Sequence, residues 1–236
     1  MMTQRILITG ANRGIGLEMT RQALARGDGV IAACRTPGSA AHLDDLAKAH
    51  DGTGAGSLTI IGLEAREDES AAAAAAAIAG PIDLLVVNAG TMNARGGLTD
   101  PGHTQDNIAE SLMTNNAGVF FTVRHFLGHL KAGTNPRIAI ISSQMGSSAR
   151  AGTSAPIYRA TKAAATNLAR SMALELADDG IAVGAYHPGW VQTDMGGANA
   201  AITAQVSAAG LLQRFDALTM ATSGVFETYE GEALPF

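Results

Sequence analysis

The chain has 236 residues, 47% hydrophobic and 16% charged, enough apolar material for one large core and a length that predicts a single domain over residues 1–236. Sixteen Lys and Arg against 21 Asp and Glu give a net charge of -5, without the basic surplus that nucleic-acid binders use to neutralise phosphates. The lone cysteine, Cys34, excludes an internal disulfide framework and a zinc site built from several thiolates.

Short apolar runs alternate along the chain with longer helical stretches, which is typical of parallel β-α-β units. The predicted strands are Arg5–Thr9, Val30–Cys34, Leu58–Leu63, Asp83–Asn88, Arg137–Ser142 and Ile181–His187. The predicted helices are Gly14–Arg26, Asp68–Ala79, Gln105–Lys131 and Ile157–Asp178. Because the strands are continuously apolar, helices should cover both faces of the sheet. We predict an α/β fold with a single doubly wound, Rossmann-type parallel sheet of about seven strands.

A glycine-rich loop follows the first predicted strand, with Gly10, Gly14 and Gly16 ahead of the first helix. Glycine lets a backbone turn tightly and approach a pyrophosphate, whose charge suits a helix N-terminus. A turn of this kind is also common for purely structural reasons. Its position between the first strand and the first helix favours dinucleotide binding.

Tyr158 and Lys162 are four residues apart in a predicted helix and therefore lie on one face of it. A nearby ammonium group favours the phenolate, so we expect Lys162 to lower the pKa of Tyr158 from about 10 toward the working range. Such a pair is a candidate for acid-base catalysis. The alternative is an ordinary Tyr and Lys on the surface of an amphipathic helix.

Several motifs occur together and in one order along the chain. They are Thr9-Gly10, Asn88-Ala89-Gly90, Asn115, Ser142-Ser143, Tyr158 with Lys162, and Pro188-Gly189-Trp190-Val191-Gln192-Thr193. In this order they resemble the short-chain dehydrogenase/reductase family, and residues 223–236 resemble its C-factor-like and Sniffer-like carbonyl reductases. The resemblance implies an enzyme that passes hydride between a nicotinamide dinucleotide and a small-molecule carbonyl or alcohol.

The resemblance also implies roles for individual residues. Tyr158 would be the general acid, and Lys162 its partner and a contact of the nicotinamide ribose. Ser143 would bind the substrate carbonyl oxygen, and Asn115, or Asn116 one residue on, would hold a water beside Lys162. The implied cofactor contacts are Gly10, Asn12, Arg13, Gly14, Ile15, Gly16, Arg35, Glu64, Asn88, Ala89, Gly90, Tyr158, Lys162, Pro188, Gly189, Val191 and Thr193. Glu64 stands where the family usually has aspartate, and extra residues in 147–153 lengthen the loop between Ser143 and Tyr158.

The choice of cofactor depends on the residues after the second predicted strand. Cys34 occupies the position where NAD-specific sites commonly carry an acidic residue. Arg35 follows it, and Arg13 lies in the glycine-rich loop, so two guanidinium groups are available for a 2′-phosphate. We therefore expect NADP(H) to be preferred, with NAD(H) possible.

Other functions have weaker support in the sequence. His125 and His129 have metal-ligand spacing, but Phe126 replaces the glutamate of a zinc protease and no third ligand is evident, so we expect no metal. Ser143 and His187 lack the G-x-S-x-G elbow of a hydrolase. A dinucleotide-binding regulatory or signalling protein remains an alternative, although it has no chemical need for Tyr158 or Ser143.

Three expectations concern the setting of the protein. No apolar run approaches the roughly 20 residues of a membrane span, and no signal peptide is evident, so we expect a cytoplasmic protein without membrane contact. Gly196-Gly197 suggests a lid over residues 195–212, with a surface helix as the alternative. The apolar faces of the helices at 105–131 and 157–178 favour a homo-oligomer, a dimer or a tetramer.

Overall fold

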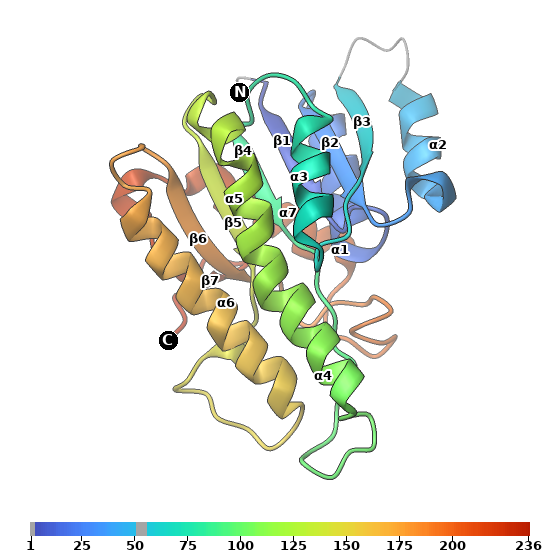
Figure 1. The fold of residues 1–236 in the computed structure, drawn as a ribbon, viewed down its shortest axis with the longest axis vertical. Helices are drawn as coiled ribbons and strands as arrows, with labels where there is room; N and C mark the ends of the chain where they lie inside the picture. The colour runs from blue at the N-terminus through green and yellow to red at the C-terminus, as the bar shows by residue number, and fades with distance from the viewer. Residues whose placement is uncertain (1–2, 51–55) are drawn as a thin grey trace.

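A computed structural model describes residues 3–50 and 56–236 and contains a seven-stranded sheet in the order β3-β2-β1-β4-β5-β6-β7, with every pair of neighbours parallel (Figure 1). The strands are β1 (Arg5–Thr9), β2 (Gly29–Cys34), β3 (Ser57–Gly62), β4 (Leu84–Val87), β5 (Arg137–Ile141), β6 (Ala182–His187) and β7 (Phe226–Thr228). The order reverses between β1 and β4, where ligands bind in doubly wound sheets. The predicted fold class is confirmed.

Seven α-helices connect the strands in the described part of the chain. They are α1 (Gly14–Ala25), α2 (Ala41–His50), α3 (Asp68–Ala76), α4 (Gln105–Leu112), α5 (Gly118–Lys131), α6 (Pro156–Glu175) and α7 (Ala204–Ala217). A π-helical turn, Met113–Ala117, joins α4 to α5, so the single helix expected over residues 105–131 is divided in two. The sequence analysis did not predict α2 or the three-residue β7.

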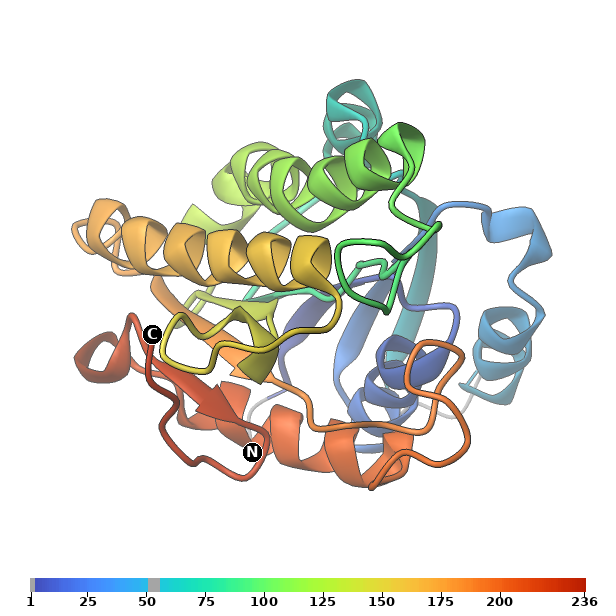
Figure 2. The same cartoon turned by 90° about the horizontal axis from the view of Figure 1, so that it is seen from below.

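Side chains alternate across the sheet and supply two cores. Leu7 belongs to the core beneath α3, α5 and α6, whereas Ile6 and Ile8 belong to the core shared with α1, α2 and α7. Figure 2 shows α6 and α5 on one side of the sheet and α7 on the other. Because both cores pack on one sheet, we propose that the predicted domain of residues 1–236 folds as one unit; residues 1, 2 and 51–55 of it lie outside the described residues.

The segment predicted as a lid is structurally divided. Residues 204–212 belong to α7, whose Ala208, Leu211 and Leu212 are buried, and this helix packs along α1. The part before α7 is tied by backbone hydrogen bonds between Gln192 and Ile202 and between Ile202 and Trp190. A lid at this position would therefore be restricted to residues 195–203.

Candidate active site

The glycine-rich loop between β1 and α1 depends on glycine at three positions. Gly10 and Gly14 have φ values of 64° and 55°, in the left-handed region that side chains rarely adopt. A Cβ at Gly16 would lie 2.2 Å from the Gly10 carbonyl oxygen, so this close approach admits no side chain. The backbone N–H of Ala11 donates to the Ala33 oxygen at 3.1 Å and fixes the loop to the end of β2.

The N-terminus of α1 fits the pyrophosphate of a dinucleotide. Arg13 occupies the N-cap position without a capping side-chain hydrogen bond, and the first turn of α1 has no acidic residue. The N–H groups of this turn, from Gly14, Ile15 and Gly16, have no partner inside the helix and carry its positive end. An anion is the partner that such a helix end favours.

Asn88 connects the end of β4 to the same loop. Its Nδ2 donates to the Thr9 oxygen at 2.9 Å and to the Gly10 oxygen at 3.2 Å. The Thr9 hydroxyl in turn accepts from the backbone N–H groups of Asn88 and Ala89, both at 3.0 Å. These four bonds hold the β1 and β4 loops together.

Tyr158 and Lys162 lie on the first turns of α6, and the Lys162 ammonium faces the Tyr158 ring. The Lys162 Nζ donates to the Ile141 oxygen at 2.8 Å and lies 5.7 Å from the centroid of the Tyr158 ring. Burial lowers the pKa of Lys162 to about 8, because a buried ammonium loses its hydration. On the predicted common face of the helix Lys162 is therefore buried and Tyr158 half-buried, which excludes the surface alternative.

The pKa of Tyr158 moves in the opposite direction to the one predicted. Burial of the phenol hydroxyl raises it to about 12, while a hydrogen bond from Ser143 and the positive charge of Arg95 act to lower it. The expectation that Lys162 brings this pKa below 10 is not met, because removal from water penalises the phenolate more than the neighbouring groups favour it. The Tyr158 phenol is accordingly protonated at neutral pH.

Asn115 lies in the π-helical turn and is almost completely buried. Its Nδ2 donates to the Thr91 oxygen at 2.9 Å and to the Thr161 hydroxyl at 3.0 Å, and its Oδ1 accepts from the Thr91 N–H. A Cβ at Gly90 would lie 3.2 Å from Asn115 Oδ1 and 3.4 Å from Lys162 Nζ. Asn115 Oδ1 and Lys162 Nζ therefore lie next to the same residue, Gly90, whereas Asn116 donates to the Thr161 carbonyl.

The ends of β5 and β6 complete the arrangement. Ser142 and Ser143 directly follow β5, and the Ser143 Oγ accepts from the Met145 N–H at 3.1 Å. After β6, Pro188 and Gly189 lead to Val191 and Thr193. A Cβ at Gly14 would lie 3.2 Å from the Thr193 methyl carbon, so the β6 loop meets the glycine-rich loop.

Comparison with known proteins agrees with this geometry. The family model described as short chain dehydrogenase matches residues 4–203. The chain belongs to this family. The C-signal of Myxococcus xanthus is 36% identical to this short-chain dehydrogenase over 158 residues, which cover 66% of this chain and 94% of that protein.

Two solved structures share the whole architecture of this family member. The NADPH-bound carbonyl reductase from chicken fatty liver superposes with a TM-score of 0.89 at 32% identity, and the carbonyl reductase Sniffer of D. melanogaster with 0.90 at 26% identity. Each comparison covers 100% of both chains. The predicted family and its C-factor-like and Sniffer-like branch are confirmed, and the protein is an oxidoreductase of that family.

The arginines predicted to bind a 2′-phosphate have acidic partners that the sequence analysis did not predict. Arg13 pairs with Asp194 at 3.1 Å, and Arg35 lies 3.7 Å from Glu64. Glu64 also lies 3.5 Å from Arg66. These partners come from distant segments, and no local pattern in the sequence indicates such pairs.

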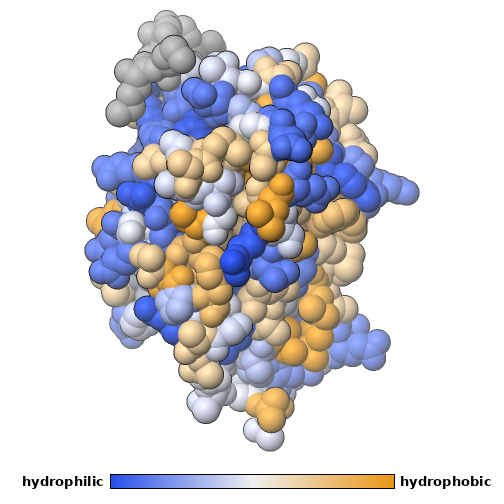
Figure 3. Space-filling view, turned by 90° about the vertical axis from the view of Figure 1, so that its left-hand side faces the viewer, coloured by the Kyte–Doolittle hydropathy of each residue, from blue (hydrophilic) through white to orange (hydrophobic). Residues whose placement is uncertain are grey.

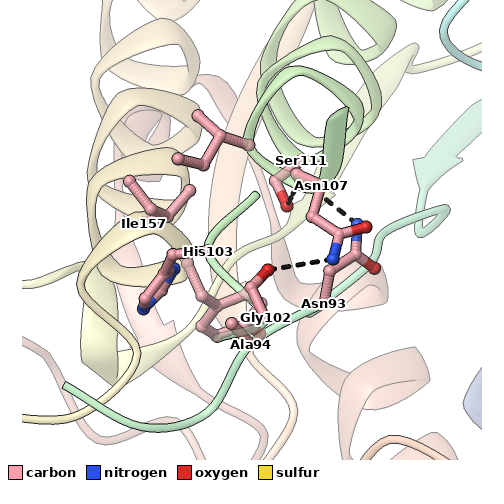
Figure 4. A pocket seen from close by; sticks show the side chains of 9 residues that line it. Asn93, Ala94, Gly102, His103, Asn107, Ser111 and Ile157 are labelled. Carbon is pink, nitrogen blue, oxygen red and sulfur yellow. Dashed lines mark hydrogen bonds between the residues drawn. The ribbon is translucent and has the colours of Figure 1, made fainter. Parts of the chain in front are cut away.

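A small cavity borders Tyr158 in this short-chain dehydrogenase (Figure 4). Its lining is Asn93, Ala94, Gly102, His103, Asn107, Ile108, Ser111, Ile157 and Tyr158. Asn107 donates to the Gly102 carbonyl at 2.9 Å, and the Ser111 hydroxyl donates to the Asn107 carbonyl at 2.8 Å, so the cavity wall is internally bonded. Among these lining residues, the sequence analysis assigned a site role to Tyr158 alone.

The two histidines with metal-ligand spacing have other partners. His125 bonds to the Asp68 carboxylate at 2.7 Å, and His129 bonds to the carbonyls of Gly80 and Ala75. Among residues 3–50 and 56–236, no cluster of three His, Cys, Asp or Glu side chains is arranged to hold a metal. No helix in that same part of the chain is both long and apolar enough to cross a membrane.

Proposed function

We propose that this short-chain dehydrogenase uses NADPH to reduce an aldehyde or ketone of a small molecule to an alcohol, with Tyr158 as the general acid. The observation that carries the proposal is the convergence of three groups at the carboxyl edge of β5. Ser143 hydrogen-bonds the phenol of Tyr158, and Lys162 lies beneath the tyrosine ring. The NADPH-bound carbonyl reductase with the same architecture supports the choice of reaction and cofactor.

A bound nicotinamide dinucleotide supplies the hydride. Ser143 and Tyr158 present two hydroxyl groups to the substrate oxygen and stabilise the negative charge that develops on it. Tyr158 then transfers its proton to that oxygen, since its pKa of about 12 keeps it protonated at neutral pH. Lys162, with a pKa of about 8, is suited to return a proton near neutral pH.

The residues that would hold the cofactor follow from the loops described above. The first turn of α1 would bind the pyrophosphate through backbone N–H groups. Arg35 and Arg13 would bind the 2′-phosphate, and Thr193 the nicotinamide carboxamide. Lys162 would contact the nicotinamide ribose, and Glu64 would lie near the adenine.

The decisive experiment compares the parent protein with Tyr158→Phe. NADPH oxidation is followed with a panel of reactive aldehydes, ketones and diones, and NADPH binding is measured by its fluorescence. We expect turnover to fall on the order of 10²–10⁴-fold without loss of binding, because only the transferable proton is removed. Tyr229→Phe is the matched control and should retain turnover. Unchanged turnover in Tyr158→Phe would exclude the mechanism.

The similarity to the C-signal supports one alternative, an NAD(P)-binding regulatory or signalling protein with little turnover. The same assay separates the two functions. A protein that binds NADPH tightly but reduces no member of the panel would favour the regulator. Measurable turnover that depends on Tyr158 would favour the enzyme.

We further propose that the protein acts in the cytoplasm as a homo-oligomer. Cys34 is buried and free, as is usual in a reducing compartment. Exposed apolar side chains occur on and between the long helices, namely Leu112, Met113, Phe120 and Leu174. Figure 3 shows hydrophobic residues in several patches among hydrophilic ones on the side of the molecule that lies at the left in Figure 1.

A further inference from the structure

The loop of residues 91–104, between β4 and α4, has a shape fixed by its own hydrogen bonds. The Asp100 carboxylate accepts from the backbone N–H groups of Gly96 at 2.5 Å and Gly102 at 2.8 Å. A Cβ at Gly96 would lie 2.6 Å from an Asp100 carboxylate oxygen, so the loop closes tightly on that side chain. The loop therefore holds the backbone of Arg95 in a fixed position.

Arg95 connects the segments on both sides of Tyr158. The backbone N–H of Ala155, the residue before α6, donates to the carbonyls of Arg95 at 3.1 Å and Gly96 at 2.8 Å. The Arg95 guanidinium donates to the Met195 carbonyl in the loop after β6. Its main chain thus bonds to the residue just before the helix that carries the tyrosine, and its side chain reaches the loop after β6.

The charge of Arg95 differs from those of the other cleft arginines. Arg13 and Arg35 have acidic neighbours, whereas in the described part of the chain Arg95 forms no ion pair and makes one side-chain hydrogen bond, to a neutral carbonyl. A guanidinium has five N–H donors in a planar fork that matches a carboxylate. Its positive charge also acts on Tyr158, lowering the pKa of the phenol against the effect of burial. An exposed positive charge, unpaired among the described residues, therefore acts on the group that would protonate the substrate.

We propose that Arg95 is a specificity-determining residue, which selects carbonyl substrates that carry a carboxylate near the reacting carbonyl. This inference rests on the proposed function. Tyr158 and Ser143 hold the carbonyl oxygen, and the free donors of Arg95 bind the carboxylate in a charge-assisted pair. A neutral substrate of the same shape gains no such bond.

The test uses matched pairs of aldehydes that differ in one charge. The kcat/KM values of 3- and 4-carboxybenzaldehyde are compared with those of their methyl esters in the parent, Arg95→Gln and Arg95→Lys. We expect the parent to prefer at least one acid over its ester by at least tenfold, which corresponds to one charge-assisted bond. Arg95→Gln should remove that preference by lowering kcat/KM for the acid at least about tenfold more than for the ester, and Arg95→Lys should retain part of it.

Arg150→Gln is the matched control, because Arg150 lies in the loop after β5 and bonds to the neutral Gln144 side chain. This variant should keep the preference for the acid. Loss of the preference in both variants would point to net charge rather than to Arg95, and would overturn the inference. An equal fall for acid and ester in Arg95→Gln would assign Arg95 a structural role through Met195 and would also overturn it.

The role of Arg95 and the proposed carbonyl reduction can be overturned by different results. Reduction of esters and acids at equal rates by the parent would overturn the role of Arg95 and leave carbonyl reduction intact. If no aldehyde, charged or neutral, is reduced, the proposed function is wrong and the role of Arg95 falls with it. The preference should also weaken as ionic strength rises, because the arginine is exposed.

Discussion

At the β1–β3 end of the cleft, charged side chains lie near the surface beside opposite charges, as Arg13 does with Asp194 and Arg35 with Glu64. At the β5–β6 end, Lys162 and His187 are buried; Lys162 donates to a backbone carbonyl, and His187 Nδ1 has no hydrogen-bond partner among the described residues. Exposed pairs contribute little to stability and exchange readily for a ligand's charge. Buried groups shift in pKa and reduce stability, but they can take part in proton transfer.

The largest expected effect is at Lys162, where activity and stability should separate. The pKa of this side chain falls from 10.5 in the unfolded chain to about 8 in the folded protein, because burial disfavours the ammonium. The folded state is therefore not penalised above pH 10.5, where the lysine is neutral in both states, and this stability is lost as the pH falls through 8. At pH 7 the buried charge lowers the free energy of unfolding by about 3 kcal/mol. Lys162→Met should therefore lose at least about 100-fold in kcat/KM yet unfold no more easily in urea at pH 7.

The Lys162→Met comparison with the parent is repeated at pH 10, where most parent molecules carry a neutral lysine in the folded state. The advantage of the variant in stability should shrink there. The Ile141 carbonyl loses its donor at both pH values, which reduces stability by about 1 kcal/mol in each case. A variant that is less stable than the parent at pH 7 but not at pH 10 would contradict the buried-charge explanation.

The buried His187 should have an intermediate effect, on the free energy of unfolding at acidic pH. Burial and the charge of Arg150 lower its pKa from 6.5 to about 4, so its contribution to stability is present above pH 6.5 and is lost as the pH falls through 4. This group should account for about 3 kcal/mol of the acid destabilisation. His187→Asn should flatten the pH dependence of the free energy of unfolding between pH 6.5 and 4, and the exposed His42→Asn should not. Identical slopes in the parent and both variants would contradict the assignment.

The elements that sequence analysis predicted well are those with strong local signals. Continuous apolar runs predicted β1 to β6, and glycine positions predicted the first loop, because a positive φ or a close backbone approach requires glycine there. The strand β7 has three residues and lies at the edge of the sheet beside β6, so its stability comes from tertiary contacts that leave no period in the sequence. The split of residues 105–131 at a π-helical turn likewise has no local pattern.

The candidate site likewise has features with a local sequence signal and features that depend on distant parts of the chain. Helical spacing predicted that Tyr158 and Lys162 share a face, and the order of motifs identified the family. The pKa of Tyr158 depends on burial, and the partners of Arg35 and Arg95 depend on loops that are distant in the chain. Electrostatics of this kind follows from three-dimensional surroundings, so the sequence predicted the residues at the site but not the direction in which their environment shifts them.

The smallest of these effects concerns cofactor choice at the exposed end of the cleft. Arg35 follows β2, and its partner Glu64 is 3.7 Å away, a distance at which an exposed pair contributes less than about 1 kcal/mol. A 2′-phosphate offers Arg35 a stronger, charge-assisted bond of about 1.5–3 kcal/mol, so the phosphate should displace the carboxylate. Arg35→Ala should lower kcat/KM for NADPH by at least about tenfold and change that for NADH by less than about threefold. Arg21→Ala, which removes an arginine of α1 that pairs with Glu18, is the control for net charge. If the parent already favours NADH, or if Arg35→Ala weakens both cofactors equally, Glu64 holds Arg35 away from the cofactor and the assignment to the 2′-phosphate is wrong.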